Sequence, residues 1–142
     1  MTIGRMIEGR SGDIVGCETG TSVREAVALF AGRRIGAVPV LENGEIVGIF
    51  SERDVVRQLA EHGPAMLDGN VGAVMTAPAI TVEPATSVMD ALGLMTRRRF
   101  RHLPVVEDGR MVGFVSIGDL VKYRIERIEA DAEAMRSYIQ SA

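Results

Sequence analysis

The chain has 142 residues, of which 46% are hydrophobic and 25% are charged, a composition that fits a globular protein and excludes a disordered or fibrous one. The net charge of -3 and the aromatic content of 4% provide neither a general attraction to phosphate backbones nor a platform for stacking bases. The single cysteine, Cys17, excludes an internal disulfide, and one cysteine with two histidines is not the usual ligand set of a structural zinc site, so no metal is expected.

The sequence predicts a cytoplasmic protein without a membrane partner. No apolar run approaches the roughly 18 residues of a membrane span, and the first residues, MTIGRMIEGRSG, lack the apolar stretch of a signal peptide. A reducing compartment suits the unpaired thiol of Cys17, which is predicted to be a buried strand residue. Neither His62 nor His102 has a sequence cue of proximity to Cys17, so no catalytic pair is predicted and the protein is not expected to be an enzyme.

The first predicted element is an extended segment over Ile14–Glu18, followed by a helix that begins at Ser22. Ser22 and Glu25 have the spacing of a helix cap and its reciprocal partner three residues on. Apolar residues then recur at helical spacing as far as Phe30, which indicates that one face of this helix is buried.

A β-hairpin and a second helix are predicted next. Ala37–Leu41 and Ile46–Phe50 are short apolar runs, and the Asn43–Gly44 pair between them supplies the positive φ angles of a tight turn. The second helix is predicted to start near Ser51. The resulting β-α-β-β-α unit, at under about 60 residues, would be marginally stable alone.

The same elements recur in a second copy. A shift of 65 residues aligns Thr21–Val56 with Thr86–Val121 without a gap, and sixteen of the aligned positions are identical. The second copy is predicted to contain an extended segment over Ala79–Glu83, a helix from Ser87, strands over His102–Val106 and Met111–Val115 joined by an Asp-Gly turn, and a helix from Ser116. Gly63–Pro78 is interpreted as the link between the copies.

These elements predict an α+β fold in which two β-α-β-β-α repeats, related by a pseudo-twofold axis, share one core. The predicted parts are repeat 1 with the N-terminal segment and the start of the linker over residues 1–70, repeat 2 over residues 71–124, and a helical tail over residues 125–142.

The tail is predicted to be a long helix, because residues 120–140 contain neither glycine nor proline. Its apolar residues are spaced as in the seam of a coiled coil. They are Val121, Ile125, Ile128, Ala132, Met135 and Ile139. Two uses of this seam stay open, namely packing across a homodimer and folding back on the same subunit.

Two short motifs stand at equivalent places in the repeats. GIFSERD, which ends at Asp54, and GFVSIGD, which ends at Asp119, share a glycine, two apolar residues, a serine and an aspartate. With RHLPV before the second hairpin, they resemble a tandem cystathionine β-synthase (CBS) domain pair, or Bateman module, of the stand-alone bacterial kind. The resemblance covers roughly residues 10–123. It implies regulation of an unidentified partner through AMP, ADP, ATP, NAD(H) or S-adenosylmethionine bound in clefts between the repeats.

The resemblance gives the two motifs a role in binding. It implies that Asp54 and Asp119 accept hydrogen bonds from the ribose hydroxyls, as a carboxylate can. Ser51 and Ser116 stand at the helix starts, where a hydroxyl and backbone N–H groups favour phosphate or ribose. The other interpretation of S-x-x-D is a capping box that only stabilises the helix start, and for the serines the two roles are compatible.

The resemblance also implies the remaining members of each cleft. The first cleft would be completed by Met75, Thr76, Ile80, Phe100, Arg101, His102 and Pro104. Arg101 and His102 match basic residues that hold phosphates in nucleotide-sensing relatives, and Arg53 is a further candidate donor. The second cleft would use Arg10, Val15, Ile35, Gly36, Ala37 and Pro39. Gly36 and Ala37 replace the basic pair there, so the second cleft is expected to be occupied more weakly or by a different ligand.

Three functions follow from these patterns. The leading hypothesis is a non-catalytic module that senses energy or redox state by binding an adenine nucleotide. A structural or dimerisation adaptor with vestigial clefts is the second. The third is weak nucleic-acid binding through Arg97–Arg101, which the net charge does not support; these arginines are also typical of a helix end, and Arg33 and Arg34 occupy the same place in the first repeat.

Overall fold

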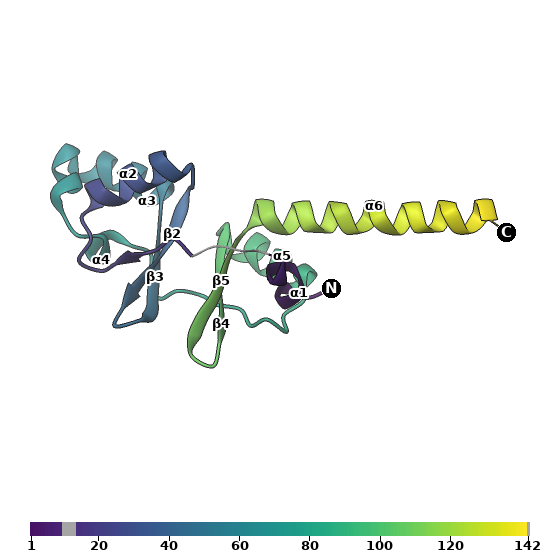
Figure 1. Cartoon of the computed structure of the whole chain (residues 1–142). Helices are drawn as coiled ribbons and strands as arrows, with labels where there is room; N and C mark the ends of the chain where they lie inside the picture. The colour runs from purple at the N-terminus through teal and green to yellow at the C-terminus, as the bar shows by residue number, and fades with distance from the viewer. Residues whose placement is uncertain (10–13, 142) are drawn as a thin grey trace.

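The computed structural model describes residues 1–9 and 14–141 and contains two small sheets, one for each repeat (Figure 1). The first sheet has the order β1 (Cys17–Glu18), β2 (Ala37–Glu42), β3 (Glu45–Ser51), and the second pairs β4 (His102–Glu107) with β5 (Arg110–Ser116). β1 runs parallel to β2. In the second repeat the equivalent parallel pairing is a single bridge between Val82 and Val105. The predicted segments 14–18 and 79–83 therefore contribute less strand than expected.

The helices that follow the predicted caps are formed. They are α2 (Val23–Arg33), α3 (Glu52–His62), α5 (Val88–Arg98) and α6 (Ile117–Ser141). The hydroxyl oxygen of Ser22 accepts a hydrogen bond from the backbone N–H of Glu25, and Ser87 does the same in the second repeat. Both α2 and α5 end at an arginine with left-handed backbone angles, Arg34 at φ 55° and Arg99 at φ 58°. The arginine pairs therefore do mark helix ends.

The two hairpins are the same structure built twice. Ala37 pairs with Ser51 in the first and His102 with Ser116 in the second, and each register shifts once, after Val40 or Val105. The turn residues Asn43 and Gly44 have φ values of 53° and 82°, and their equivalents in the second turn have 52° and 76°. Positive φ at both positions is the tight hairpin turn that the Asn-Gly and Asp-Gly pairs predict.

Each repeat is completed by a segment from outside its own predicted unit. α1 (Ile3–Glu8) packs on the second repeat: Ile3 N donates to Thr86 O at 2.8 Å, and Ile3 and Met6 are buried in the second core. The linker contains η1 (Pro64–Asp68) and α4 (Val71–Val74), whose Met66 and Val71 are buried in the first core. Residues 64–74 thus cover repeat 1, across the boundary predicted at residue 70.

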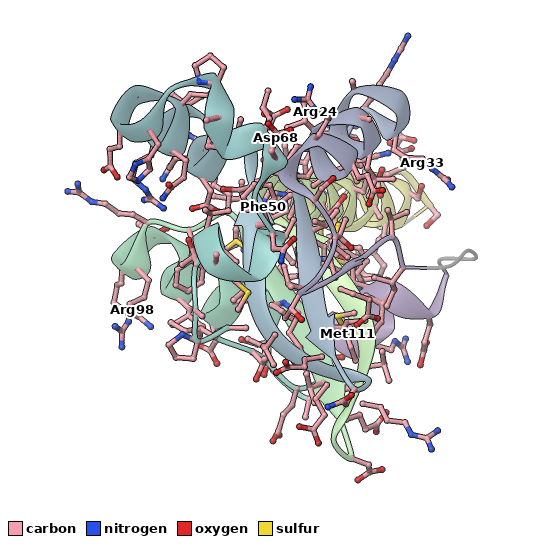
Figure 2. All side chains as sticks on the ribbon, turned by 90° about the vertical axis from the view of Figure 1, so that its left-hand side faces the viewer. Arg24, Arg33, Phe50, Asp68, Arg98 and Met111 are labelled. Atoms are coloured by element: carbon pink, nitrogen blue, oxygen red, sulfur yellow. The ribbon has the colours of Figure 1, made fainter. Side chains whose placement is uncertain are left out.

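No helix was predicted for α1, η1 or α4. Arg24 in α2 and Asp68 in η1 form an exposed salt bridge of 3.1 Å between repeat 1 and the linker, and Figure 2 shows the two side chains next to each other. The N-terminal helix has a local signal, because Ile3, Met6 and Ile7 lie at helical spacing behind the cap Thr2, whose hydroxyl oxygen accepts a hydrogen bond from Arg5 N.

The described residues form two separate buried cores, one in each repeat, in place of the single shared core that was predicted. In the first, Phe50 is fully buried and stacks on Phe30 with ring centroids 5.8 Å apart. Cys17 is buried in β1, as predicted, and desolvation by burial raises the pKa of its thiol above the ordinary value. Leu103 and Leu120 are fully buried in the second core. The sheets meet where β3 contacts β5.

α6 begins against the second repeat and then leaves it. Leu120 is buried and Tyr123 packs against the second core, while the rest of the helix projects beyond the body of the molecule (Figure 1). Among residues 1–9 and 14–141, none of the helices has both the length and the apolar character needed to cross a bilayer.

Candidate functional site

A cavity of about 520 Å³ lies between the two repeats, beside the start of α3. Its volume is in the range of small-molecule sites, about 300–1,000 Å³. Eight of the ten residues predicted for the first cleft line it: Ser51, Arg53, Asp54, Thr76, Ile80, Phe100, Arg101 and His102. The other two lie nearby in the fold, Met75 against Gly48 of β3 and Pro104 buried within β4.

Asp54 is the one buried charged side chain among the described residues, with 2% of its surface exposed. Its Oδ2 accepts hydrogen bonds from Ser51 N at 2.9 Å and Ser51 Oγ at 3.1 Å. Its Oδ1 accepts from Arg57 at 2.6 Å and from Thr76 Oγ1 at 2.8 Å. A carboxylate has about four acceptor positions, so the contacts within the protein satisfy Asp54 completely.

The S-x-x-D motif forms a capping box in both repeats. Asp54 N donates to Ser51 Oγ at 3.3 Å while the Asp54 carboxylate accepts from Ser51 N. In the second repeat Asp119 N donates to Ser116 Oγ at 3.1 Å, and Ser116 N donates to Asp119 Oδ2 at 2.8 Å. The helix-cap interpretation is therefore correct as geometry. The cap uses only Oδ2 of Asp54, whereas Oδ1 accepts hydrogen bonds from Arg57 and Thr76, which line the cavity.

The linker reaches this site by pairing with β3. Ile49 N donates to Thr76 O and Thr76 N donates to Ile49 O, both at 2.9 Å. A Cβ built on Gly48 would lie 2.6 Å from Met75 Sδ and 2.8 Å from the carbonyl oxygen of Thr76. Only a residue without a side chain lets the linker approach β3 this closely, and that approach brings the Thr76 hydroxyl to Asp54.

The lining of the cavity is strongly basic. Among the described residues, five arginines and two carboxylates line it; they are Arg53, Arg57, Arg98, Arg99 and Arg101 with Glu52 and Asp54. Arg57 is paired with Asp54, and Arg53 donates to the backbone oxygen of Arg99 at 3.3 Å. Arg98 extends into solvent at the edge of the molecule in Figure 2. Three of the four arginines in the run Arg97–Arg101 thus belong to the wall of this cavity.

Several lining residues were not predicted for the first cleft. They are Gly36, Ile49, Glu52, Arg57, Pro78, Ala79, Arg98 and Arg99. Arg57 had a local signal, because it stands three residues after Asp54 on a helix and side chains at this spacing are neighbours. Gly36 was predicted for the second cleft, and the structure places it in the wall of the first.

His102 combines basic character with partial burial. Desolvation by burial lowers the pKa of its imidazole, the charge of Arg101 lowers it further, and the carboxylates of Asp119 and Glu52 oppose the shift. The ring also stacks on Phe114, with centroids 5.5 Å apart. The lowered pKa favours the neutral imidazole at pH 7, in a cavity lining that also contains five arginines.

The residues predicted for the second cleft are only partly described. Arg10 lies outside the described residues. Val15 and Ile35 pack against the first core, Ala37 and Pro39 are buried in β2, and Ser116 and Asp119 form the cap of α6. The role of this group as a ligand site stays a prediction. Among the described residues, no cluster of three histidine, cysteine or acidic side chains could hold a metal ion.

Comparison with known proteins decides the family. The CBS domain model matches the chain twice, over residues 10–61 and 71–126. The chain belongs to the CBS domain family. The mitochondrial CBS domain-containing protein CBSX3 of Arabidopsis thaliana is 37% identical over 129 residues, which cover 87% of this chain but only 63% of CBSX3. The tandem CBS pair inferred from the repeated motifs is therefore confirmed.

Solved structures agree with this assignment. The CBS-domain containing protein ATU1752 from Agrobacterium tumefaciens superposes with a TM-score of 0.83 at 35% identity, covering 87% of this chain and 99% of that one. CBSX2, whose structure was determined in complex with AMP, superposes with a TM-score of 0.72 at 25% identity, over 88% of this chain and 96% of that one. A CBS domain pair of this shape is thus known to hold an adenine nucleotide in at least one relative.

Proposed function

We propose that this CBS pair is a non-catalytic regulatory module that binds an adenine nucleotide, of the AMP, ATP or NAD(H) type, in the cavity beside Asp54. The observation that carries the proposal is the position of Asp54 Oδ1. This oxygen accepts hydrogen bonds from Arg57 and Thr76, which line a cavity where arginines outnumber carboxylates. The complex of the related CBSX2 with AMP supports the ligand class.

Each part of a nucleotide has matching side chains in the cavity. The apolar side chains of Ile49, Ile80 and Phe100 suit the faces of an adenine ring. Asp54 suits two neighbouring ribose hydroxyls, since a carboxylate accepts two hydrogen bonds side by side. The guanidinium groups suit phosphate oxygens, because each presents a planar fork of donors.

Binding requires an exchange at Asp54, because Arg57 and Thr76 already occupy Oδ1. The side chain of Arg57 is 51% exposed, so it can leave the carboxylate without opening the core. In this proposal the ribose hydroxyls replace the donors on Oδ1 and Arg57 turns towards the phosphates. Asp54 keeps its cap bonds on Oδ2, so the start of α3 stays formed.

The exchange provides a route from ligand to regulation. Thr76 belongs to the linker, whose residues 66 and 71 complete the first core. When the ribose replaces the Thr76 hydroxyl, the linker loses one of its contacts with α3, and the position of the two repeats can respond. A ligand shifts such an equilibrium only by its difference in affinity for the two states.

The excess of arginines over carboxylates in the cavity lining predicts an order of affinity among the candidate ligands. A polyphosphate compensates more of the positive charge than a monophosphate, so ATP is expected to bind more tightly than AMP. S-adenosylmethionine carries a sulfonium cation and no phosphate, and is expected to bind weakest. Charge complementarity of this kind decides specificity even where it adds little net affinity.

Titration calorimetry with AMP, ATP, NADH and S-adenosylmethionine tests the proposal. A bound ligand also raises the stability of the fold, by about 2.7 kcal/mol at 100 times its dissociation constant. Heat and a thermal shift with the phosphate-containing ligands are expected. The absence of both heat and a thermal shift with every adenosyl ligand at millimolar concentration would contradict the proposal.

A further inference from the structure

The projecting part of α6 carries an apolar stripe that its own subunit does not cover. We propose that this stripe is the interface of a parallel, in-register coiled coil between the tails of two copies of this chain. The proposal is independent of nucleotide binding. The stripe, here called the tail seam, consists of Val121, Ile125, Ile128, Ala132, Met135 and Ile139.

The tail seam is exposed in the single subunit. Five of its six side chains, all except Ala132, are between 42% and 65% exposed. The helix is continuous over Ile117–Ser141, so the residues of the tail seam lie on one face of it. Large apolar side chains gathered on one exposed face indicate an interaction surface.

The charges beside the seam fit a parallel pair. With Ile125, Ala132 and Ile139 at the a positions, Arg124 and Asp131 fall at g, and Glu129 and Arg136 fall at e. A g residue in a parallel pair faces the e residue five places further along the partner helix. Arg124 then meets Glu129 of the partner, and Asp131 meets Arg136 of the partner. Both pairs join opposite charges.

An antiparallel pair that buries the whole seam brings like charges together. Val121 would face Ile139 of the other copy, which places Asp131 opposite Asp131 and Glu129 opposite Glu129. Antiparallel registers shifted by one heptad avoid these clashes but cover only residues 121–132 or 128–139 and leave the rest of the tail seam exposed. The parallel register is the one that satisfies both the seam and the charges.

The existing salt bridge on the tail does not oppose this arrangement. Arg136 pairs with Glu133 in the same helix at 3.2 Å, and both side chains are about 70% exposed. An exposed pair of this kind contributes little. Arg136 can therefore exchange Glu133 for Asp131 of the partner at small cost, as charged residues at the rim of a coiled coil do.

Cysteine cross-linking tests the orientation in the full-length chain. The variants are made in a Cys17→Ala background. In a parallel pair the cysteine of Met135→Cys faces the same cysteine of the second copy, and mild oxidation is expected to give a disulfide-linked dimer. Ser137→Cys, on the outer face of the same helix, is the matched control and is expected to remain monomeric on a denaturing gel. Cross-linking only in a mixture of Ile125→Cys with Met135→Cys would show an antiparallel pair and overturn the proposal.

Sedimentation velocity tests the partner and the charges. The wild-type chain is expected to be a dimer, and Ile128→Glu a monomer that keeps its helical circular dichroism. Asp131→Arg is expected to raise the dimer dissociation constant about tenfold, and adding Arg136→Asp is expected to restore it. Glu126→Arg changes the net charge equally on the outer face and is expected to have no effect. A monomeric wild type, a dimer insensitive to Ile128→Glu, or equal effects of Asp131→Arg and Glu126→Arg would each overturn the proposal.

Discussion

Thr76 Oγ1 donates a 2.8 Å hydrogen bond to Asp54 Oδ1, which ties the linker between the repeats to the first turn of α3. The acceptor is the carboxylate that the proposed function assigns to the ribose. If the proposal holds, a bound ribose and the linker compete for this one oxygen.

Thr76→Val removes this hydroxyl and keeps the side-chain shape. The free energy of unfolding is expected to fall by about 1 kcal/mol, the usual value of one such bond. Adenine nucleotide affinity is expected to rise, because the ribose no longer displaces the hydroxyl. Chemical denaturation and calorimetry measure the two effects. Thr96→Val, which loses a 2.9 Å bond to Leu92 O in α5, is the control; a fall in nucleotide affinity specific to Thr76→Val would contradict the exchange.

Gly48→Ala should be more damaging than Gly113→Ala, its equivalent in the second repeat. The added methyl meets Thr76 O at 2.8 Å, a backbone atom, whereas at Gly113 it meets the flexible end of Ile7 at 3.1 Å. Overpacking costs about 1–3 kcal/mol where neighbours cannot move. Denaturant unfolding of both variants measures the difference. Equal stabilities would show that the linker is not held by β3 as described.

Arg101→Ala is expected to weaken phosphate-bearing ligands selectively. Arg101 lines the cavity, and a guanidinium bonded to phosphate contributes about 1.5–3 kcal/mol, or roughly tenfold to a hundredfold in affinity. The loss should be large for ATP, smaller for AMP and absent for adenosine. Arg110→Ala, in the exposed second hairpin, is the control. An equal loss for adenosine and ATP would mean that Arg101 does not act on the phosphates.

His102 predicts a pH dependence with opposite signs for stability and binding. Burial lowers its pKa in the folded protein, so the unfolded chain binds a proton first, near its ordinary pKa of about 6.5. Its contribution to stability is complete above that pH and is lost as the pH falls through the lower, folded pKa. A bound phosphate favours the charged ring, so nucleotide affinity should rise as the pH falls from 7.5 to 6. His102→Gln provides the reference, because the phosphate itself titrates near pH 6; identical profiles would exclude His102.

Local signals in the sequence were sufficient for most of the fold. The Asn43–Gly44 turn and its equivalent need positive φ, and Ser22 and Ser87 cap helices through contacts three residues away, so short-range chemistry determined these elements. η1 and α4 were missed because they are short and are stabilised by packing of Met66 and Val71 in the first core, which no local pattern displays. α1 has a local signal, but nothing local shows that Ile3 packs in the second core.

The candidate site was predicted less completely than the fold. Repeat equivalence and family resemblance correctly gathered Asp54, Thr76 and Arg101 at one cavity. They could not show that Arg57 and Thr76 already saturate the carboxylate, because hydrogen-bond geometry depends on how the linker crosses β3. Gly36, predicted for the second cleft, also lines this cavity, because its backbone oxygen accepts a 3.0 Å hydrogen bond from Glu52 N at the start of α3, a contact that no local pattern displays.

The most direct test of the account is calorimetric titration of ATP into the wild type, Asp54→Asn and Asp119→Asn. We expect the wild type to bind ATP at a site whose affinity falls at least about tenfold in Asp54→Asn, with circular dichroism showing that the variant remains folded. Asp119→Asn, altered at the equivalent cap, should retain that site. Unchanged ATP affinity in folded Asp54→Asn would contradict the central claim that this carboxylate holds the nucleotide.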